Sequence, residues 1–395
     1  MRLRSRSSGL LLSELGGYLM GFAHAPAGTK RLSNLLRSKK WSHHLIEEHI
    51  QNQAINHAED MLEKNQQPLL LWDESVQEKP ESIEAEGLCA VRSSKAGRLL
   101  RIKRGYYDPP TKKPVHVPGL RWVALLLCGL HHPPVVAKFS WWTSRGKYVT
   151  SLAQLRFQLL QWVRDHFADT VLHVFDRGYA SSNWIGLLLS KSDRFLLRWP
   201  SRYRLLDQEG RARKAYLFSV GRKPSSSKML WDSRAKCNLK RSLLWFSCFH
   251  PDYPENKLTL IICRSGKQGR QPWYLLTTEE VDSDKKAWEM VFAYAKRWDI
   301  EQCFRFNKSE LAMESCRLWF WHNRMKLLYT VTLVYAFLLS LLDEKLAQQR
   351  RKLLRLGCHR TGKRCRNAST PLYRIRLAIA NLFNLAFNPE AQNSG

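Results

Sequence analysis

Two short apolar runs, each ending in an aspartate, constrain the fold of this chain more than any other feature. The runs cover residues 68–73 and 171–176, and their last residues are Asp73 and Asp176. A short apolar run that ends in an acid and a turn is typical of a buried strand with a carboxylate at its C-terminal end. We therefore expect two buried strands of an α/β sheet, each presenting an acid where the strand stops.

The other elements expected between residues 66 and 200 follow a recognisable order. They are strands over 120–130 and 135–142, a helix over 151–167 capped by Ser151, a helix over 183–190 and a strand over 194–199. With the two apolar runs and a late helix, this is the order of an RNase H-like α/β core, a mixed sheet flanked by helices. The first and fourth strands are neighbours in such a core, so Asp73 and Asp176 are predicted to lie close together.

The charge of the chain favours a polyanionic partner. Lys and Arg number 64 and Asp and Glu number 34, which gives a formal charge of +30 at pH 7. Such an excess destabilises a compact fold through self-repulsion unless a polyanion such as DNA or RNA binds it. An anionic membrane is the competing partner, but the apolar run over 327–342 is shorter than the about 20 residues that span a bilayer. We expect a buried helix there, a nucleic-acid partner and no membrane.

The hydrophobic content of 44% excludes a largely disordered chain and allows more than one domain. The expected segments are a helical, DNA-binding N-terminal domain (1–65), the first part of the core (66–200), a basic, β-rich insertion (201–280), the remainder of the core (281–345) and a basic tail (346–395). Short strands are expected in the insertion over 243–249, 258–263 and 273–277.

The cysteines indicate a reducing compartment. The chain has 9 cysteines and no Cys-x-x-Cys pair, so neither a disulfide framework nor a close-paired zinc site is expected. The nearest candidate, with Cys358, His359 and Cys365, lies in the basic tail and is interpreted as structural. Residues 1–25 have the outline of a signal peptide, but Glu14 interrupts their apolar stretch. We therefore expect a cytoplasmic protein.

The late helix carries four polar residues at regular steps. A helical pattern begins after residue 284, and Tyr294, Arg297, Glu301 and Lys308 follow at steps of 3, 4 and 7. At about 100° per residue these side chains fall within a sector of roughly 60° on one helix face. The apolar residues expected to pack on the sheet from the opposite face are Trp288, Phe292 and Ala295.

This face would complete a metal site with the two strand-end acids. Two carboxylates held close together repel one another unless a cation lies between them, and a divalent ion is the usual solution. Glu301 is the candidate third acid, so Asp73, Asp176 and Glu301 are predicted to bind Mg²⁺ or Mn²⁺ through hard oxygen ligands. The cations and the phenol of the same helix face suit the phosphates that flank a scissile bond.

The pattern Y-x2-R-x3-E-x6-K, with its glutamate as third acid, resembles the signature of insertion-sequence DDE transposases, and more narrowly that of the insertion-sequence-four family. Asp73 resembles the first aspartate of that family, and Asp176, within Phe-Asp-Arg-Gly-Tyr, resembles the second. Residues 273–277 resemble the strand that closes the family's β insertion. The resemblance covers roughly residues 65–345.

The resemblance implies a transposase that cleaves DNA at transposon ends and transfers the strand into target DNA. The family's chemistry is a two-metal phosphoryl transfer, with two ions per active site held by the three acids. It implies DNA contacts from Tyr294, Arg297 and Lys308. Members with this motif are associated with a hairpin intermediate that needs a base turned out of the duplex, and Trp298 is a candidate stacking residue. Further aromatic candidates in the insertion are Trp231 and Trp245.

The implied partners are the terminal inverted repeats of a transposon, target DNA and a second copy of the chain in a synaptic homodimer. The implied location is the bacterial cytoplasm, in association with the nucleoid. Two other functions remain open: an RNase H-like, structure-specific endonuclease that cuts without joining, and a non-catalytic, DNA-binding relic of a transposase. At single residues, Asp73 and Asp176 could be turn acids, Glu301 could form an i,i+4 ion pair, and Trp298 could belong to the core.

Overall fold

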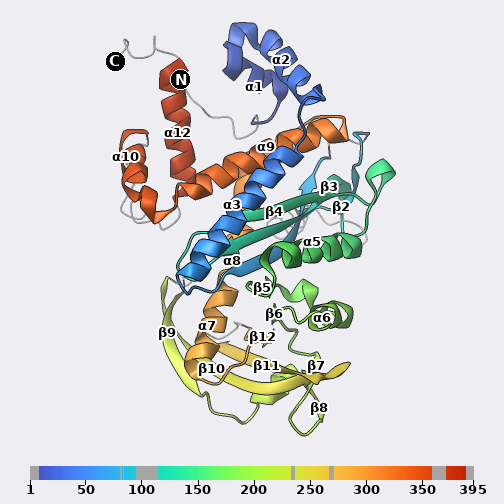
Figure 1. Cartoon of the computed structure of the whole chain (residues 1–395), viewed down its shortest axis with the longest axis vertical. Coiled ribbons are helices and arrows are strands. Elements are labelled where there is room, and N and C mark those ends of the chain that lie inside the picture. Colours follow the sequence, from blue (N-terminus) through green and yellow to red (C-terminus); the bar gives the residue numbers. More distant parts are fainter. Residues whose placement is uncertain are drawn as a thin grey trace, which may run out of the picture.

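A mixed β-sheet runs through the middle of the molecule, with helices on both of its faces (Figure 1). The computed structural model describes residues 9–80, 82, 84–94, 114–232, 236–266, 271–357 and 371–387. The N-terminal helices and the last two helices gather at one end of the long axis, and the strands of the β-rich segment lie at the other end (Figure 1). Cys358, His359 and Cys365 lie outside the described residues.

Five strands form the central part of the sheet. They are β1 (Leu69–Glu78), β3 (His116–Cys128), β4 (Val135–Trp142), β5 (Leu172–Phe175) and β6 (Phe195–Arg198). Their spatial order is β4-β3-β1-β5-β6, with β3 antiparallel to β4 and β1, and β5 parallel to both β1 and β6. This arrangement is RNase H-like, and it confirms that the first and fourth strands of the core are neighbours.

Helices cover both faces of this sheet because β1 and β5 are apolar on both sides. Leu70 and Trp72 pack with α5 (Leu152–Phe167) and α6 (Ser182–Leu189). Leu69 and Leu71 share the other core with α7 (Asp284–Ala295), α8 (Trp298–Ser309) and α9 (Trp321–Ser340). The Ser151 hydroxyl accepts a hydrogen bond from the Gln154 amide and caps α5, as predicted.

The β-rich segment continues the central sheet. Its strands are β7 (Arg204–Leu206), β8 (Ala212–Lys214), β9 (Ser226–Asp232), β10 (Cys237–His250), β11 (Tyr253–Ser265) and β12 (Trp273–Thr277). β12 pairs antiparallel with β6, with Leu276 opposite Leu197. The described strands, including β2 (Cys89–Arg92) on β3, therefore form one 12-stranded sheet.

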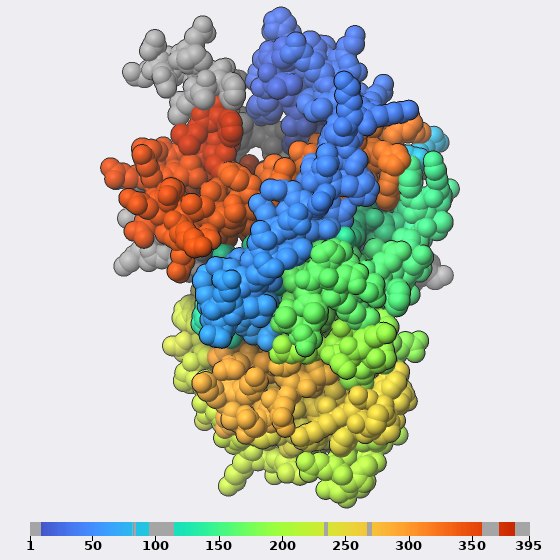
Figure 2. Space-filling model, viewed as in Figure 1, coloured from blue at the N-terminus to red at the C-terminus, as the bar shows by residue number. Residues whose placement is uncertain are grey.

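The N-terminal helices contact the core through α3 and through the end of α2. They are α1 (Leu12–Met20), α2 (Ala25–Arg37) and α3 (His44–Glu63), and α3 lies across the molecule beside α5 (Figure 2). The Lys138 ammonium on β4 lies 3.1 Å from the Glu47 carboxylate on α3. The Lys326 ammonium on α9 donates to the carbonyls of Leu36 (3.1 Å) and Ser38 (2.6 Å), where α2 ends. These two lysines fasten the N-terminal helices to the sheet and to α9.

The C-terminal segment contains helices. α10 (Ala347–Gly357) packs against α12 (Leu372–Phe387), and α12 also contacts α9. The apolar run expected to form a buried helix lies in α9, which confirms that prediction. No single described helix is long and apolar enough to cross a membrane; α9 and residues Glu344–Gly357 meet the criterion only together, as a pair bent by 76°.

Several one-turn 3-10 helices join these elements. They are η1 (Phe22–His24), η2 (Gly146–Tyr148), η3 (Arg177–Tyr179), η4 (Ala215–Ser219), η5 (Met313–Ser315) and η6 (Glu344–Leu346). Of these, η3 begins directly after Asp176, the residue that follows β5, and its Tyr179 amide donates to the Asp176 carbonyl (3.0 Å). The turn after the second acid is thereby fixed by a backbone hydrogen bond.

Candidate active site

The parallel pairing of β1, β5 and β6 ends in one row across the sheet. β1 itself continues to Glu78 because β3 pairs with it that far, so the prediction that this strand stops at Asp73 is wrong. Trp72 on β1 pairs with Phe175 on β5, and Phe175 pairs with Leu197 on β6. The next residues along the three strands are Asp73, Asp176 and Arg198. Neighbouring strands lie about 4.8 Å apart, so this register brings the two acids to adjacent positions.

The alternation of side chains along a strand decides which helices the acids face. Leu71 and Val174, two residues before Asp73 and Asp176, belong to the core shared with α7 and α8. Side chains two positions apart point to the same face of a sheet. Asp73 and Asp176 therefore face α7 and α8, which carry the Tyr-Arg-Glu-Lys pattern.

The three predicted acids converge on one tyrosine and one arginine. The Tyr294 hydroxyl donates a hydrogen bond to Asp176 Oδ1 (3.1 Å). Arg297 Nη1 donates to Asp73 Oδ2 (3.4 Å), and Arg297 Nη2 donates to Glu301 Oε1. The acids come from β1, from the end of β5 and from α8, so the fold joins segments more than 100 residues apart in the sequence.

The prediction of one continuous helix is wrong, because the helix breaks between α7 and α8. Lys296 and Arg297 keep helical backbone angles, but the Arg297 amide bonds to the Tyr294 carbonyl (3.1 Å) and the Asp299 amide to the Lys296 carbonyl (2.8 Å). These are the i→i−3 bonds of a tighter, 3-10-like turn. Arg297 lies at this turn, between Tyr294 on the last turn of α7 and Glu301 on the first turns of α8.

The expected separation of a polar face from an apolar face is also wrong for α7. Tyr294 is 2% exposed and its ring packs edge-on against Trp273 at 5.1 Å between centroids, whereas Ala295 is exposed. α7 is buried on a broad face, because both the central strands and the β-rich segment pack against it. Tyr294 therefore belongs to the core through its ring and to the acid cluster through its hydroxyl.

The electrostatics of the cluster follow from its burial and from its excess of acids. Burial raises the pKa of Asp73 to about 6; the Glu74 amide and Arg297 lower it, whereas Asp176 and Glu301 raise it further. Burial and the Asp176 carboxylate raise the pKa of Tyr294 to about 12, so its hydroxyl keeps the proton that it donates. Burial lowers the pKa of Arg297, but Tyr294, Asp176 and Glu301 outweigh burial and hold it above its ordinary value.

The donor set of this cluster fits a divalent cation. Three carboxylates supply hard oxygen ligands of the kind that Mg²⁺ and Mn²⁺ prefer. Burial is the main cause of the raised pKa of Asp73, and the carboxylates of Asp176 and Glu301 add to it. In this arrangement the Arg297 side chain lies between Asp73 and Glu301, so those two acids share a guanidinium.

Another group of possible metal ligands has its ligand atoms closer together than the three acids do. Within the described part of the chain, one set of three possible ligand residues has its ligand atoms within 4.8 Å of one another, namely His43, His44 and Glu47 at the start of α3. The Lys138 ammonium already neutralises the Glu47 carboxylate there, and His44 Nδ1 lies 3.3 Å from its other oxygen. We interpret this set as an anchor of α3 on β4.

A hydrogen-bonded aromatic layer supports the acids from the other face of the sheet. The Trp72 indole donates to His173 Nδ1 (2.9 Å), which joins β1 to β5 one residue before Asp73. Burial lowers the pKa of His173 to about 3, so its ring is neutral and accepts this bond. Arg156 on α5 donates to Glu74 (2.8 Å from Nε) and lies 4.0 Å from the centre of the Tyr179 ring. This layer fixes the residues on both sides of the acids.

Sequence reasoning missed Arg198 and this supporting layer. Arg198 follows Leu197, the last residue of β6 that pairs with β5, so the strand register could have identified it beside Asp176. Arg198 also hydrogen-bonds Tyr294 and lowers the pKa of its hydroxyl. Glu74 and Tyr179 lie within a few residues of the acids in sequence, but their shared partner Arg156 becomes apparent only in three dimensions.

The remaining predicted residues lie on α8. Lys308 is half-buried on the last turn, about 10 Å along the helix axis from Glu301. Trp298 is 40% exposed, and the Arg305 guanidinium lies 6.0 Å from the centre of its ring, so the alternative that Trp298 belongs to the core is wrong. In the insertion, Trp231 is 66% exposed, whereas Trp245 is half-buried and donates to Asp284 (3.0 Å).

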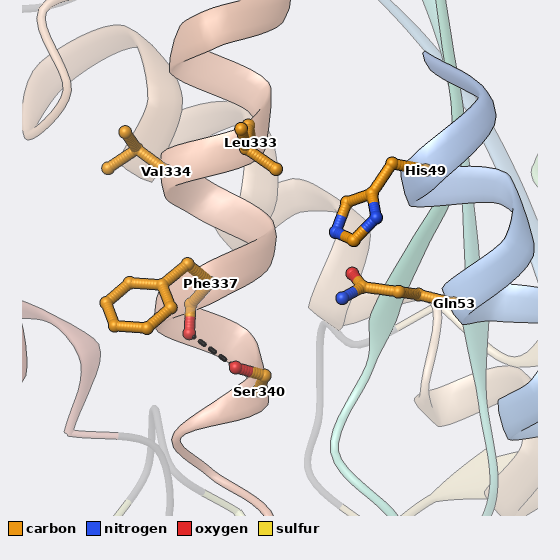
Figure 3. A pocket seen from close by; sticks show the side chains of 6 residues that line it. All are labelled: His49, Gln53, Leu333, Val334, Phe337 and Ser340. Carbon is orange, nitrogen blue, oxygen red and sulfur yellow. Dashed lines mark hydrogen bonds between the residues drawn. The ribbon is translucent and has the colours of Figure 1, made fainter. Parts of the chain in front are cut away.

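A hollow of about 390 Å³ lies away from this cluster, between α3 and α9 (Figure 3). The residues that line it are His49, Gln53, Leu333, Val334, Phe337 and Ser340. The acid cluster contributes none of these side chains, so the hollow is not part of the candidate active site.

Residues 149–337 match the family model of the transposase DDE domain. The match covers just under half of the chain; it includes Asp176, Tyr294, Arg297 and Glu301 and begins after Asp73. It supports a DDE transposase and does not test the narrower resemblance to the insertion-sequence-four family.

A solved structure is also similar to this chain. It is the cryo-EM structure of the piggyBac transposase synaptic complex with hairpin DNA, with 12% sequence identity and a TM-score of 0.37. The similarity covers 82% of this chain and 54% of that chain, so the present chain spans about half the length of that transposase. A search of curated proteins gave no match.

Proposed function

We propose that this protein is a metal-dependent transposase that cleaves DNA at transposon ends and joins them to target DNA. The observation that carries the proposal is the convergence of Asp73, Asp176 and Glu301, from three distant segments, on the Tyr294–Arg297 pair. The match of residues 149–337 to the transposase DDE domain supports the same reaction class. The insertion-sequence-four family is the narrower assignment that the Tyr-Arg-Glu-Lys spacing favours.

In this proposal the three acids hold two Mg²⁺ or Mn²⁺ ions. Bound divalent ions supply an activated water or 3′-hydroxyl and stabilise the leaving oxygen of the phosphodiester. Asp73 provides a ligand from within β1, Asp176 provides one from the end of β5, and Glu301 closes the site from α8. The Trp72–His173 and Arg156–Glu74 contacts hold the strand ends in position, so the acids need little reorganisation when substrate binds.

The cations and aromatics around the acids hold the DNA. Arg297 and Lys308 on one side of α8 are suited to the phosphates next to the scissile bond, and the Tyr294 hydroxyl can donate to a phosphate oxygen. Trp298, next to Arg297 in the sequence, offers a partly exposed ring on which an unstacked base can stack. The formal charge of +30 supplies the non-specific attraction to the duplex.

The DNA partners in this proposal are the terminal inverted repeats and the target DNA. A synaptic homodimer would bring two transposon ends together, and the bacterial nucleoid would be the setting of the reaction. The helical segment before residue 65 is the proposed site of additional DNA contacts. Among the exposed side chains of α2 that suit phosphates are Lys30, Arg31 and Arg37.

A joining assay tests the proposal. Pre-cut DNA made from the sequences that flank the gene is incubated with the full-length protein, supercoiled plasmid and Mg²⁺. Strand-transfer products are expected with the native protein and are expected to be lost with Asp176→Asn. Asp282→Asn, at an exposed position just before α7, is the matched control and should leave the products unchanged.

The same assay separates the alternatives. Cleavage without joined product would favour a structure-specific endonuclease. If the native protein binds DNA and neither cleaves nor binds metal, and Asp176→Asn changes nothing, the chain is a DNA-binding relic. Glu301→Gln should remove cleavage in Mg²⁺ while leaving metal-free DNA binding nearly intact, because it removes a ligand and not a phosphate contact.

A further inference from the structure

We propose that Arg297 is a displaceable counter-ion that competes with divalent metal for Asp73 and Glu301, and that a DNA phosphate releases it. Metal binding and DNA binding would then be coupled through one side chain. This inference rests on the proposed function, because it assumes that the acids bind metal and that DNA enters the site.

The position of Arg297 is the first observation. Its two terminal nitrogens contact different acids, Nη1 at Asp73 Oδ2 and Nη2 at Glu301 Oε1. The Arg297 side chain is 14% exposed, and those of Asp73 and Glu301 are 22% and 34% exposed. The guanidinium therefore takes the place between the first and third acid that a shared cation would need, and it uses the same oxygen atoms.

The two contacts differ in strength. The Arg297–Asp73 distance of 3.4 Å is longer than the about 2.7–2.9 Å of a strong charge-assisted hydrogen bond. The contact with Glu301 is close, as expected for an i,i+4 pair on one helix. Asp73 is thus held loosely by Arg297, and its carboxylate still faces Asp176 and Glu301 across the cluster.

Charge explains why metal and guanidinium exclude one another. The single positive charge of Arg297 is shared by two carboxylates, and a divalent ion in its place would compensate for both. Mg²⁺ needs its oxygen ligands at about 2.0–2.1 Å in octahedral geometry, which leaves no room for Nη1 and Nη2 on the same oxygens. The two cations would also repel each other at such a distance.

DNA supplies the alternative partner for Arg297. Guanidinium groups bind phosphate oxygens through two parallel hydrogen bonds, and they do so more strongly than neutral donors. The neighbouring Trp298 ring is 40% exposed and Arg305 is exposed, so this side of α8 is open to a duplex. A phosphate that binds Arg297 removes the competitor from Asp73 and Glu301, and metal affinity rises.

Coupling of this kind is reciprocal, so metal should raise DNA affinity by the same factor by which DNA raises metal affinity. In the absence of DNA, Asp73 and Glu301 would remain paired with Arg297, and the protein would bind metal weakly. The metal site would then be completed where a phosphodiester is present, and free metal alone would not assemble it.

The test measures Mn²⁺ binding to the full-length protein by electron paramagnetic resonance of free Mn²⁺, without DNA. Arg297→Gln is expected to bind Mn²⁺ about tenfold more tightly than the native protein, because the competitor is gone. Arg305→Gln removes the same charge from the same helix without touching the acids, and it should change the affinity less than about twofold. Equal effects of the two variants, or no gain in Arg297→Gln, would overturn the inference.

A second experiment repeats the Mn²⁺ titration in the presence of an uncleavable duplex. The Mn²⁺ that the duplex itself binds is measured with the Glu301→Gln protein and subtracted. DNA should tighten Mn²⁺ binding about tenfold in the native protein and should have little effect in Arg297→Gln. Should circular dichroism show that Arg297→Gln does not fold, Arg297→Lys takes its place, with a smaller expected gain in Mn²⁺ affinity.

Absence of Mn²⁺ binding in every protein, with and without DNA, would refute the proposed function itself. Equal tight binding in all of them would refute the coupling alone.

Discussion

Replacing Asp73 by Asn should stabilise the metal-free protein, by an amount that grows with pH. Asp73 has a pKa of about 6 in the folded protein against an ordinary value of 3.8, because it is buried beside two other acids. An acid whose pKa is raised by folding binds its proton more tightly in the folded state. Its ionisation therefore costs stability, fully so above about pH 6 and not at all below about pH 3.8.

The magnitude follows from the shift. Each pKa unit corresponds to 1.36 kcal/mol, so the full cost of ionised Asp73 is about 3 kcal/mol. Between about pH 4.5 and pH 7.5 this cost of ionisation increases by about 2 kcal/mol. The difference in unfolding free energy between Asp73→Asn and the native protein should thus rise by about 2 kcal/mol across this interval, in favour of the variant.

Urea unfolding of both proteins in the presence of a chelator, followed by circular dichroism, measures this difference. Asp282→Asn is the matched control at an exposed position, and its difference from the native protein should not change with pH. Saturating Mn²⁺ at pH 7.5 should reverse the order, because metal stabilises the native protein and not the variant. A pH-independent difference for Asp73→Asn would refute the reasoning that burial and like charges destabilise this carboxylate.

Three further variants test other parts of the structure. Trp72→Phe leaves the buried His173 nitrogen without its donor, so urea unfolding should show a loss of about 1–3 kcal/mol. Lys326→Met removes the donor for the Leu36 and Ser38 carbonyls, so hydrogen exchange should speed up in α1 and α2 and stay unchanged in the central strands. The third variant replaces three exposed cations of the β-rich segment by alanine, at Arg202, Lys214 and Lys223. It should weaken DNA binding and reduce the slope of log K against log salt by up to about 3, and an unchanged slope would show that the phosphate contacts lie elsewhere.

Much of the central fold could be predicted from local patterns. Apolar runs bounded by turns located β5 and β6, and Ser151 located the start of α5, because burial and capping leave clear signals in sequence. The order of the strands in the sheet was predicted from the order of helices and strands along the chain, which is that of an RNase H-like core. The full length of β10 and β11 was not predicted, since their outer parts are polar and are held by pairing with each other.

The sequence predicted which residues gather in the acid cluster, but not how they contact one another. Helical spacing grouped Tyr294, Arg297 and Glu301, and strand ends supplied the two aspartates. The break at Lys296 was not predictable, because the sequence around it contains no Gly or Pro and keeps its helical periodicity. The contact of Arg297 with Asp73 depends on that break and on how α8 packs against β1, which only the three-dimensional structure determines.

The hydrogen bonds between β6 and β12 have a mechanical consequence. Leu275 pairs with Arg198, and Arg198 stands beside the strand end that carries Asp176. Swinging the β-rich segment as an independent arm would require breaking these backbone bonds. A duplex held by the exposed cations of that segment, as the proposed function requires, would therefore lie at a fixed distance from the carboxylates.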